Sequence, residues 1–565
     1  MSASDDLEPV INSTIKEAIQ RTAGDEVDDL GIALKNAVSE AYLNWPNEAG
    51  FDHLDEHRGP IELNFQGTIP SWAAGSLFRT GPGLSKIEDT PKGTIQISHW
   101  FDGLAHTHRF DIVTDPENNR TKVLYSSRRQ SDDFVNYVQQ NGFHDMISFG
   151  QKSDPCAGLF SKLMTSWSAA KPNRETKKLE NVAVTVQLGV PGLQSSSNPE
   201  GSHRAKKTVW LGTDAHYLRE LDPQTLEPIG FAVQNALHPG LDGPLACAHA
   251  QRCPVTGDYF NINIDGGPKP EYKVFRVSAT TGETVILANL SFHNLPMAYI
   301  HSFYLSEHFV ILRVPSSHFS SHGLSMLWKK NLLEAMEPFD NSKRCRWFVV
   351  DRHHGRGLVT KFDTEAAFFF HTVNCFEEPV SQIRGPKVIL TMDTVEYPTM
   401  DILEALKYDV LLNHRLAWLR IIPRRPMTEI PTPIVDKPIN IPAPHVGELP
   451  TINPAYHTKP YRFVYSLAMG CRSTFVDTIV KTDLVTHEAL QWNNPTGHTP
   501  GEAIFVGRPG ASEEDDGVLL SVVLDGTCAK SYLLCLDAMT MKEMGRAEMD
   551  FAVGFGFHGV HTTEI

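Results

Sequence analysis

Near its amino terminus the chain alternates apolar and polar residues with the period of an amphipathic helix. Apolar side chains recur every three or four positions over residues 6–22 and again over residues 30–45. Because this spacing places them on one face of a helix, it predicts two helices. We therefore expect an N-terminal helical extension that covers residues 1–56.

From about residue 57 the pattern changes to short apolar runs that are interrupted by Gly, Pro, Asn and Asp, as strands and turns require. Several runs share one form: an apolar strand, then Asp or Ser, a turn that contains Thr, and a second strand. Asp, Pro and Thr satisfy backbone groups within such a turn, so each unit predicts a β-hairpin. The units cover residues 218–231, 272–288, 479–492 and 532–549.

Repeated hairpins of this kind are typical of the blades of a β-propeller, although a β-sandwich with many strands remains an alternative. We expect an all-β fold over residues 57–565. Two segments interrupt the strand pattern, at about 130–171 and 399–445, and the second is rich in proline. They are expected to form helical and loop insertions that cap the propeller.

Composition and charge narrow the functional classes. The 565 residues are 41% hydrophobic and 21% charged, which is typical of a globular protein. A formal charge of -16 argues against binding to nucleic acid, because phosphate contacts need a basic surface. The eight cysteines form no CxxC pair, which fits a reduced compartment. The acidic start resembles no signal peptide and no long apolar run is present, so we expect a cytoplasmic protein that is neither secreted nor membrane-spanning.

Histidine supplies the candidate chemistry. Of 25 histidines, His249, His301, His371 and His558 lie within or at the end of apolar, strand-like runs. The inner strands of propeller blades point toward one axis, so four blades could bring these imidazoles to one metal ion. Four unrelated histidines of the core are the alternative, and spacing alone favours it. His99, His106 and His108 form a denser group that, by spacing, would be the better metal candidate.

Several motifs that contain these histidines resemble the carotenoid cleavage oxygenase family, and within it a fungal branch. The resemblance extends from about residue 57 to the end of the chain and is carried by "LFRTGPG", "HWFDGLAHTHRF", "AHAQRCPVTGD", "IHSFYLSEHFVIL", "FFFHTVNCFEE" and "FHGVH". It implies a seven-bladed β-propeller with one Fe²⁺ on its axis. The implied iron ligands are His249, His301, His371 and His558, with O₂ as co-substrate.

Neutral imidazoles leave the charge of a metal uncompensated, so carboxylates are expected behind them to orient the ring N–H groups. By the same resemblance, Asp214, Glu448 and Glu502 support His301, His371 and His558, and His249 has no such support. Asp214 replaces the family's usual Glu, so a longer or water-bridged contact is expected there. A surface carboxylate is the alternative for each. Val184 is matched to a small residue near a vacant position on the iron.

The resemblance implies addition of O₂ across a conjugated C=C bond of a carotenoid or apocarotenoid, of the torulene or β-carotene type, to give aldehydes such as apocarotenals or retinal. Cleavage of a stilbene is one alternative. The stilbene-cleaving relatives hold a phenolic hydroxyl with a Tyr and a Lys, and Ser127 stands at the position of that Lys, although Arg128 or Arg129 could compensate. The other alternative is a propeller that binds ligands without catalysis.

A hydrophobic polyene must be drawn from a membrane or lipid body, so peripheral contact with such a surface is expected. Residues 155–171 place apolar side chains on one helical face with lysines beside them, as an interfacial helix does. Residues 411–425 are a second candidate, and a cap helix packed on the propeller is the alternative for both. Nothing in the sequence indicates an oligomeric state.

Overall fold

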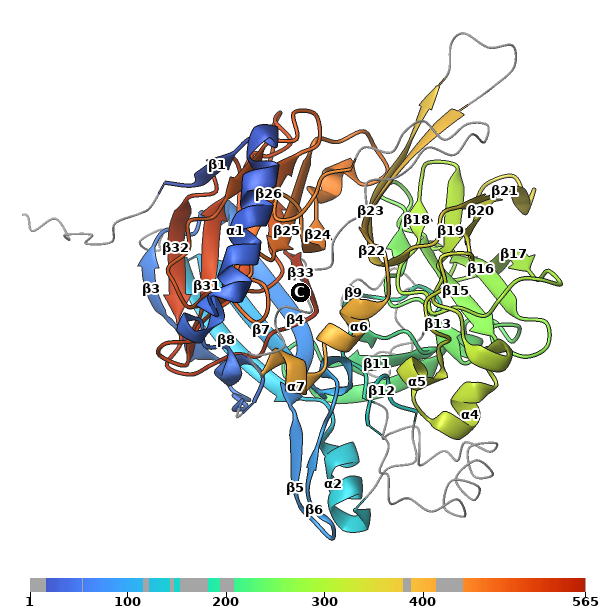
Figure 1. The fold of residues 1–565 in the computed structure, drawn as a ribbon, viewed down its shortest axis with the longest axis horizontal. Coiled ribbons are helices and arrows are strands. Elements are labelled where there is room, and N and C mark those ends of the chain that lie inside the picture. Colours follow the sequence, from blue (N-terminus) through green and yellow to red (C-terminus); the bar gives the residue numbers. More distant parts are fainter. Residues whose placement is uncertain are drawn as a thin grey trace, which may run out of the picture.

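The computed structural model describes residues 17–52, 54–114, 121–142, 147–152, 181–193, 208–379, 388–412 and 440–563. Antiparallel sheets surround a common centre, near which the edge strands β33, β9 and β24 lie (Figure 1). Three sheets follow one another in the first half of the chain. The first has the order β2 (Ile61–Glu62), β8 (Thr121–Arg129), β7 (Leu104–Thr114), β4 (Gly75–Leu84) and β33 (His558–Thr562); the second β12 (Pro228–Val233), β11 (Tyr217–Leu221), β10 (Val209–Gly212) and β9 (Thr185–Leu188); the third β13 (Leu245–Ala246), β15 (Tyr259–Asp265), β16 (Glu271–Val277) and β17 (Thr284–Leu290), with β14 (Gln251–Arg252) beside β15.

Three further sheets and a ribbon complete the ring. The fourth sheet is β18 (Tyr304–Leu305), β19 (Phe309–Val314), β20 (Cys345–Asp351) and β21 (Leu358–Thr364); the fifth β1 (Ile19–Arg21), β27 (Ala489–Gln491), β26 (Thr478–Asp483), β25 (Phe463–Ala468) and β24 (Glu448–Thr451); the sixth β28 (His498–Pro500), β30 (Gly517–Asp525), β31 (Lys530–Asp537), β32 (Glu543–Glu548) and β3 (Asn64–Gly67), with β29 (Ile504–Gly507) beside β30. The ribbon is β22 (Phe368–Pro379) with β23 (Val388–Tyr397), and a separate hairpin is β5 (Lys86–Thr90) with β6 (Gly93–Gln96).

The all-β propeller is confirmed, but the prediction of seven blades was wrong. Six sheets have four to six strands and qualify as blades. Between the fourth and fifth lies only the ribbon β22–β23, whose long strands pair with each other and with no third strand among the described residues. Register shifts between Phe369 and Asn374 bend the ribbon, and in Figure 1 it extends away from the ring. A two-stranded unit of this kind does not make a blade.

The four predicted hairpins are all present, and their turns share one construction. In each, the strand ends at Asp or Ser and the chain turns through a residue with positive φ. The Asp222 carboxylate accepts hydrogen bonds from the backbone N–H groups of Gln224 and Thr225, at 2.9 and 2.8 Å. The residues with positive φ in the four turns are Leu226, Gly282, His487 and Met541. Because the side-chain bonds are local, each turn forms without help from distant residues.

The N-terminal segment agrees in part with its predicted helices. The second predicted helix is present as α1 (Glu26–Val38), followed by a short 3-10 turn at Ala41–Asn44. Of the first, residues 6–16 lie outside the described residues, and Ile19–Arg21 forms strand β1 instead, paired with Ala489–Gln491. The open edge of β27 offers backbone hydrogen bonds that outweigh the helical preference of a short segment.

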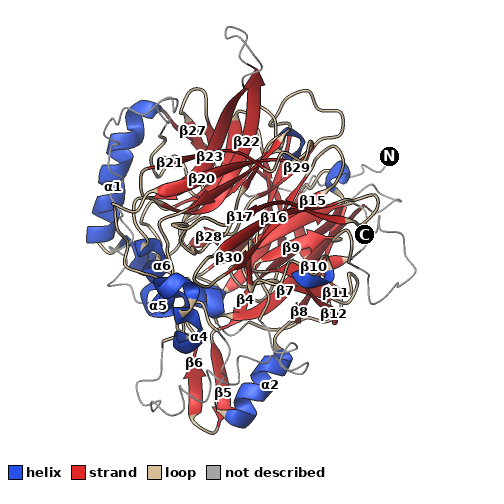
Figure 2. Cartoon of the chain, turned by 90° about the vertical axis from the view of Figure 1, so that its right-hand side faces the viewer, coloured by secondary structure: helices blue, strands red, loops and turns tan. Residues whose placement is uncertain are grey.

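The described α-helices gather at one side of the strands (Figure 2). They are α1, α2 (Asp132–Asn141), α4 (Ser325–Lys329), α5 (Leu332–Ala335), α6 (Asp401–Ala405) and α7 (Tyr408–Leu411). Helices α2, α6 and α7 belong to the segments expected to cap the propeller, and residues of each line the cavity described below. Further 3-10 turns are Ala23–Asp25, Glu48–Gly50, Ser71–Ala73, Trp100–Asp102, Gln234–Ala236, Ser320–Gly323 and Pro454–Tyr456.

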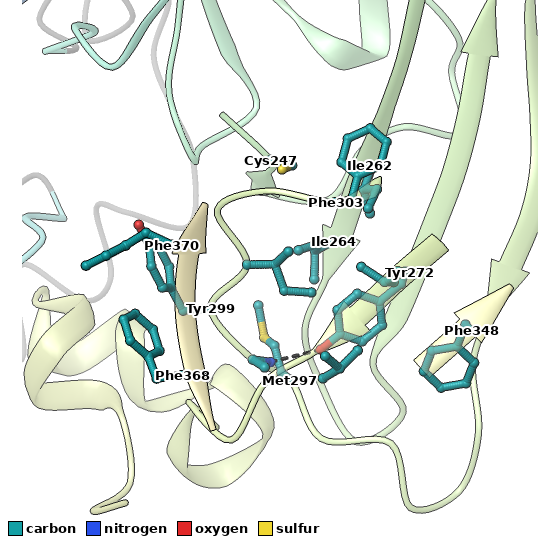
Figure 3. Close-up of a cluster of buried hydrophobic side chains, with 14 of the residues drawn as sticks. Cys247, Ile262, Ile264, Tyr272, Met297, Tyr299, Phe303, Phe348, Phe368 and Phe370 are labelled. Atoms are coloured by element: carbon teal, nitrogen blue, oxygen red, sulfur yellow. Dashed lines mark hydrogen bonds between the residues drawn. The ribbon is translucent and has the colours of Figure 1, made fainter. Parts of the chain in front are cut away.

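A cluster of buried aromatic and aliphatic side chains fixes the segment that leads into the site (Figure 3). Tyr272 accepts a hydrogen bond from the N–H of Ala298 at 2.9 Å and donates to the carbonyl of Pro296 at 2.7 Å. Both partners lie in the irregular stretch before β18. The buried hydroxyl therefore helps to hold an irregular segment, which also forms an isolated β-bridge between Ala298 and His318, and this segment carries His301.

Candidate metal centre

Four histidines from distant parts of the chain meet at the centre of the ring. His249 lies between β13 and β14, His301 precedes β18, His371 lies within β22, and His558 is the first residue of β33. One nitrogen of each lies within 4.8 Å of the others, and the described residues contain no other such group of three or more metal-ligating side chains. The sequence pattern placed His558 at the close of the last strand, but it opens that strand, opposite Thr80 of β4.

The nitrogens are spaced as the ligands of one ion would be. The Nε2 atoms of His249 and His301 are 3.2 Å apart, and so are those of His371 and His558. Metal–imidazole bonds of about 2.0–2.1 Å would separate two nitrogens at right angles by about 3 Å. The rings also stand at steep angles to one another, for example 88° between His249 and His558. The arrangement suits a transition-metal ion.

Three carboxylates hold the outer nitrogens of three of these rings. The Nδ1 atoms of His301, His371 and His558 lie 2.9, 2.6 and 2.8 Å from Asp214, Glu448 and Glu502, respectively. Each carboxylate accepts a hydrogen bond from Nδ1–H, so Nε2 keeps its lone pair and points it inward. No carboxylate contacts the ring of His249 among the described residues. These pairings are the ones implied by the resemblance.

Asp214 contacts His301 directly and without a water bridge, and its contact of 2.9 Å is the longest of the three. The shorter side chain reaches His301 because the loop that carries Asp214 is tied to the strand beside it. The carbonyl of Asp214 accepts from the N–H of Ala246 at 2.8 Å, and its carboxylate accepts from the N–H of Ala248 at 3.1 Å.

Two glycines let the ligand-bearing segments approach their neighbours. A Cβ atom at Gly559 would lie 2.7 Å from the carbonyl oxygen of Phe78, and one at Gly447 would lie 1.8 Å from that of Leu467. Gly559 follows His558, and Gly447 precedes Glu448. Larger residues would push strand β33 or β24 away from its partner and move the histidine or the carboxylate with it.

Burial and neighbouring groups favour the neutral forms of His249 and His558 and the charged forms of Glu448 and Glu502. Burial, together with the proximity of the other histidines, lowers the pKa of His249 well below its ordinary value, and burial also lowers that of His558. Burial by itself would raise the pKa of Glu448, but His371 and the hydroxyl of Tyr397 outweigh it and the pKa is lowered. Glu502 behaves in the same way beside His558 and Arg79. Neutral nitrogen donors backed by anions are the donor set that a divalent cation requires.

A large cavity reaches the inner face of three of the histidines. Its volume is about 870 Å³, near the upper end of the range for ligand pockets. Aromatic and aliphatic side chains dominate its wall, and His301, His371 and His558 interrupt that wall. Val184 also lines it and is half-buried. The aromatic residues of the wall include Trp100, Phe101, Phe149, Phe370, Phe475 and Phe557.

The sequence matches the retinal pigment epithelial membrane protein family over residues 50–563, which is most of the chain. The chain belongs to this family. Among curated family members, a carotenoid dioxygenase of Neurospora crassa is 48% identical, with 96% of this chain and 95% of the relative covered. A torulene dioxygenase of Gibberella fujikuroi is 46% identical, covering 96% and 98%. A beta,beta-carotene 15,15'-dioxygenase of Mus musculus is 26% identical, covering 89% of each.

The fold of this chain also occurs in solved structures. A mutant of Synechocystis apocarotenoid oxygenase matches with a TM-score of 0.64 at 20% identity, covering 92% of this chain and 98% of the other. A cobalt-substituted form of the Synechocystis protein gives the same values. At this identity the likeness concerns the fold, and it agrees with the propeller described above.

The denser histidine group of this family member is not a metal site. The ring of His99 donates from Nε2 to the carbonyl of Leu403 at 2.9 Å and accepts at Nδ1 from the N–H of Phe101 at 3.1 Å. His108 pairs with the hydroxyl of Tyr125 at 2.8 Å. His106 is buried beside them without the convergent ligand atoms of the central group. His106 and His108 lie on one strand, β7, where their rings pack with centroids 4.3 Å apart, whereas His99 lies outside that strand at the start of the turn Trp100–Asp102.

Sequence reasoning missed the residues that hold the carboxylates. Tyr299 donates to Asp214 at 2.7 Å and Tyr397 donates to Glu448 at 2.5 Å. Arg79, which is 2% exposed, donates from Nη1 to the carbonyl of Glu502 at 2.8 Å. Arg79 lies in the motif "LFRTGPG" that carried the resemblance, so its position was visible although its role was not. The tyrosines gave no signal, because nothing in their local sequence marks them.

The positions weighed for a phenol-binding clamp do not reach the cavity. Ser127 is buried in β8, where its hydroxyl accepts from the N–H of His57 at 3.0 Å. Arg128 pairs with Glu227 at 2.7 Å, and Arg129 donates to the carbonyl of Leu54 at 2.9 Å. None of the three lines the cavity wall. Their identity therefore does not discriminate between a polyene and a stilbene.

The two segments considered for contact with lipid fall largely outside the described residues. Residues 155–171 lie outside them entirely, and of 411–425 only 411 and 412 are described. Among the described residues, none of the helices has both the length and the apolarity needed to span a bilayer.

Proposed function

We propose that this chain is a dioxygenase that cleaves one conjugated C=C bond of a carotenoid or apocarotenoid with O₂ to give two carbonyl products. The proposal rests on one observation: an apolar cavity reaches three histidines of a four-histidine centre that is held by carboxylates. Relatives at 46–48% identity that are named as carotenoid and torulene dioxygenases support it.

We assign one Fe²⁺ per chain to His249, His301, His371 and His558, and its positioning to Asp214, Glu448 and Glu502. Bound there, the ion would supply the activation of O₂ that allows one oxygen atom to be added to each carbon of the broken bond. The histidines bind through Nε2, and the carboxylates fix the rings of His301, His371 and His558 by hydrogen bonds from Nδ1–H. No nucleophile or acid–base pair is required of the protein.

The other residues bind and orient the polyene. An apolar wall holds a conjugated chain without hydrogen bonds, and it excludes the water that would compete in the reaction. Trp100, Phe101 and Phe557 form one continuous set of aromatic contacts, with ring centroids 4.6 to 6.0 Å apart, on the side of the cavity near His558. We assign to Val184 the role of limiting access to the ion from the cavity wall that it lines.

Among polyenes, we infer that a torulene-type chain is the first to test. The torulene dioxygenase is 46% identical, whereas the beta,beta-carotene dioxygenase is 26% identical.

We propose that loading requires contact with a membrane or lipid body, because the substrate is dissolved there. Ile147 and Leu327 line the cavity and are 48% and 50% exposed, and the neighbouring Trp328 is 50% exposed. Apolar side chains at a cavity mouth, with tryptophan among them, are suited to the boundary between water and lipid.

The test is purification of the chain, measurement of its iron, and analysis of aldehydes formed from torulene, β-carotene, an apocarotenal and a stilbene. We expect iron near one per chain and aldehydes from a carotenoid. An iron-loaded protein that releases no aldehyde would support a binding propeller instead, and aldehydes from the stilbene alone would support the other alternative.

A further inference from the structure

A second, much smaller cavity lies between helix α1 and the metal centre. Its volume is about 110 Å³, compared with about 870 Å³ for the main cavity. Leu30, Ala33 and Ala37 of α1 form one wall. The opposite wall includes Tyr397 and Glu448, and Glu448 holds His371 at 2.6 Å. The cavity therefore begins under the N-terminal helix and ends at a carboxylate that contacts a proposed metal ligand.

The two cavities adjoin across a few side chains. Five residues line both: Tyr397, Ile402, Glu448, Met469 and Phe475. Glu448 and Tyr397 are fixed by their mutual hydrogen bond of 2.5 Å. Met469 is unbranched and half-buried, and methionine side chains change rotamer readily. The partition between the cavities is therefore thin and includes at least one adaptable side chain.

The small cavity has too little volume for a polyene and suits a small, largely apolar molecule. No side-chain polar atom of its lining is buried without a hydrogen-bond partner among the described residues. Most of its lining is apolar, although Tyr397, Glu448 and Ser473 contribute polar groups, and apolar cavities of about 150 Å³ bind xenon or benzene. At about 110 Å³ the space holds a diatomic gas easily.

Helix α1 forms one wall of this space. Its face toward the cavity carries the small residues Ala33 and Ala37, whereas Leu30, at the edge, is 49% exposed. Asn36 anchors the helix by donating to the carbonyl of Gly470 at 2.9 Å. The family match begins at residue 50, so α1 lies outside it.

We propose that the cavity under α1 is an antechamber through which dioxygen reaches the metal centre, separate from the cavity that receives the polyene. The proposal rests on the proposed function, since it concerns the co-substrate of that reaction. Ala33 and Ala37 keep the antechamber open, and a larger residue at either position closes it. The polyene and dioxygen then approach the histidines from different sides and do not obstruct each other.

Xenon tests the site without any reaction. A crystal of the full chain under xenon pressure is expected to show xenon between α1 and Glu448. Ala37→Phe fills the space and is expected to abolish that site. Val38→Phe is the matched control: it adds a ring to the next residue of the helix, where the side chain is 85% exposed, and xenon binding should persist. Absence of xenon in the wild-type protein would overturn the proposal.

The second measurement is kinetic. In Ala37→Phe we expect kcat/KM for dioxygen to fall severalfold, while KM for the polyene at saturating oxygen and the iron content stay unchanged. Val38→Phe should match the wild type in all three. A change in KM for the polyene instead of the oxygen dependence would assign the space to the substrate chain and refute the proposal.

Ala33→Val, a smaller enlargement on the same face, replaces Ala37→Phe if that variant does not fold, with the same outcomes. Failure of the proposed function appears separately, as a wild-type, iron-loaded protein that makes no aldehyde. The antechamber proposal fails if the wild-type protein cleaves polyene but binds no xenon. It also fails if neither alanine variant changes the dependence of the rate on oxygen.

Discussion

Replacing Glu448 by glutamine removes the charge that orients His371 and leaves the shape of the side chain. In the structure both carboxylate oxygens accept: Oε2 from Nδ1 of His371 at 2.6 Å, and Oε1 from the hydroxyl of Tyr397 at 2.5 Å. The amide of glutamine offers one acceptor and one donor. One of the two partners must then turn its proton away or lose its bond.

The magnitude follows from these contacts. Hydrogen bonds to charged groups contribute about 1.5–3 kcal/mol. The Glu448 side chain is only 13% exposed, so solvent screens the interaction little. Loss of a group behind a metal ligand typically costs about 10–100-fold in metal affinity or activity, which corresponds to about 1.4–2.7 kcal/mol. The two estimates agree, and we expect Glu448→Gln to fall in this range.

The assay is competition for iron with a chelator of known affinity, together with the rate of aldehyde formation at saturating iron. Tyr397→Phe is the matched control: it removes one donor from the same carboxylate but leaves the charge and the bond to His371, so it should weaken iron binding less. Thermal unfolding of both apoproteins checks that the fold is kept. Equal iron affinity in Glu448→Gln and the wild type, or a larger loss in Tyr397→Phe, would refute the reasoning.

Three further perturbations test other parts of the structure. His371→Ala should abolish iron binding and activity while cooperative unfolding persists, and wild-type iron occupancy would exclude His371 as a ligand. Val184→Phe projects a ring from the wall of the main cavity, so kcat/KM for the polyene should fall by about tenfold to a hundredfold at unchanged iron content; an unchanged rate would show that Val184 lies away from the reacting chain. Burial lowers the pKa of His99 from 6.5 to about 4. Between these pH values the imidazole is protonated in the unfolded state and neutral in the folded state. Stability should then decline as pH falls from about 6.5 to 4, by roughly 3 kcal/mol for this residue, and urea unfolding of the wild type against His99→Gln across that interval measures it.

Local structure was readable from the sequence because local contacts determine it. The hairpin turns depend on an Asp or Ser and a Thr a few residues later, and those groups bond one another within the turn. Helix α1 was predicted from apolar spacing, but Leu34 and Val38 of the expected apolar face are 43% and 85% exposed, so the helix was found without its buried face. The four central histidines were marked by their apolar surroundings, but spacing alone ranked them below the cluster of His99, His106 and His108. It was the resemblance to a family that reversed that order.

Only the tertiary structure decided which groups meet. Successive central histidines are separated by 52 to 187 residues along the chain, and no local rule links them. Their convergence depends on the closure of the ring, in which β33 pairs with β4. The same holds for the blade count, since whether β22–β23 gains a third strand depends on neighbours elsewhere in the ring. Tyr299, Tyr397 and the cavity under α1 also arise between segments far apart in sequence, because packing in three dimensions, and not periodicity, sets those distances.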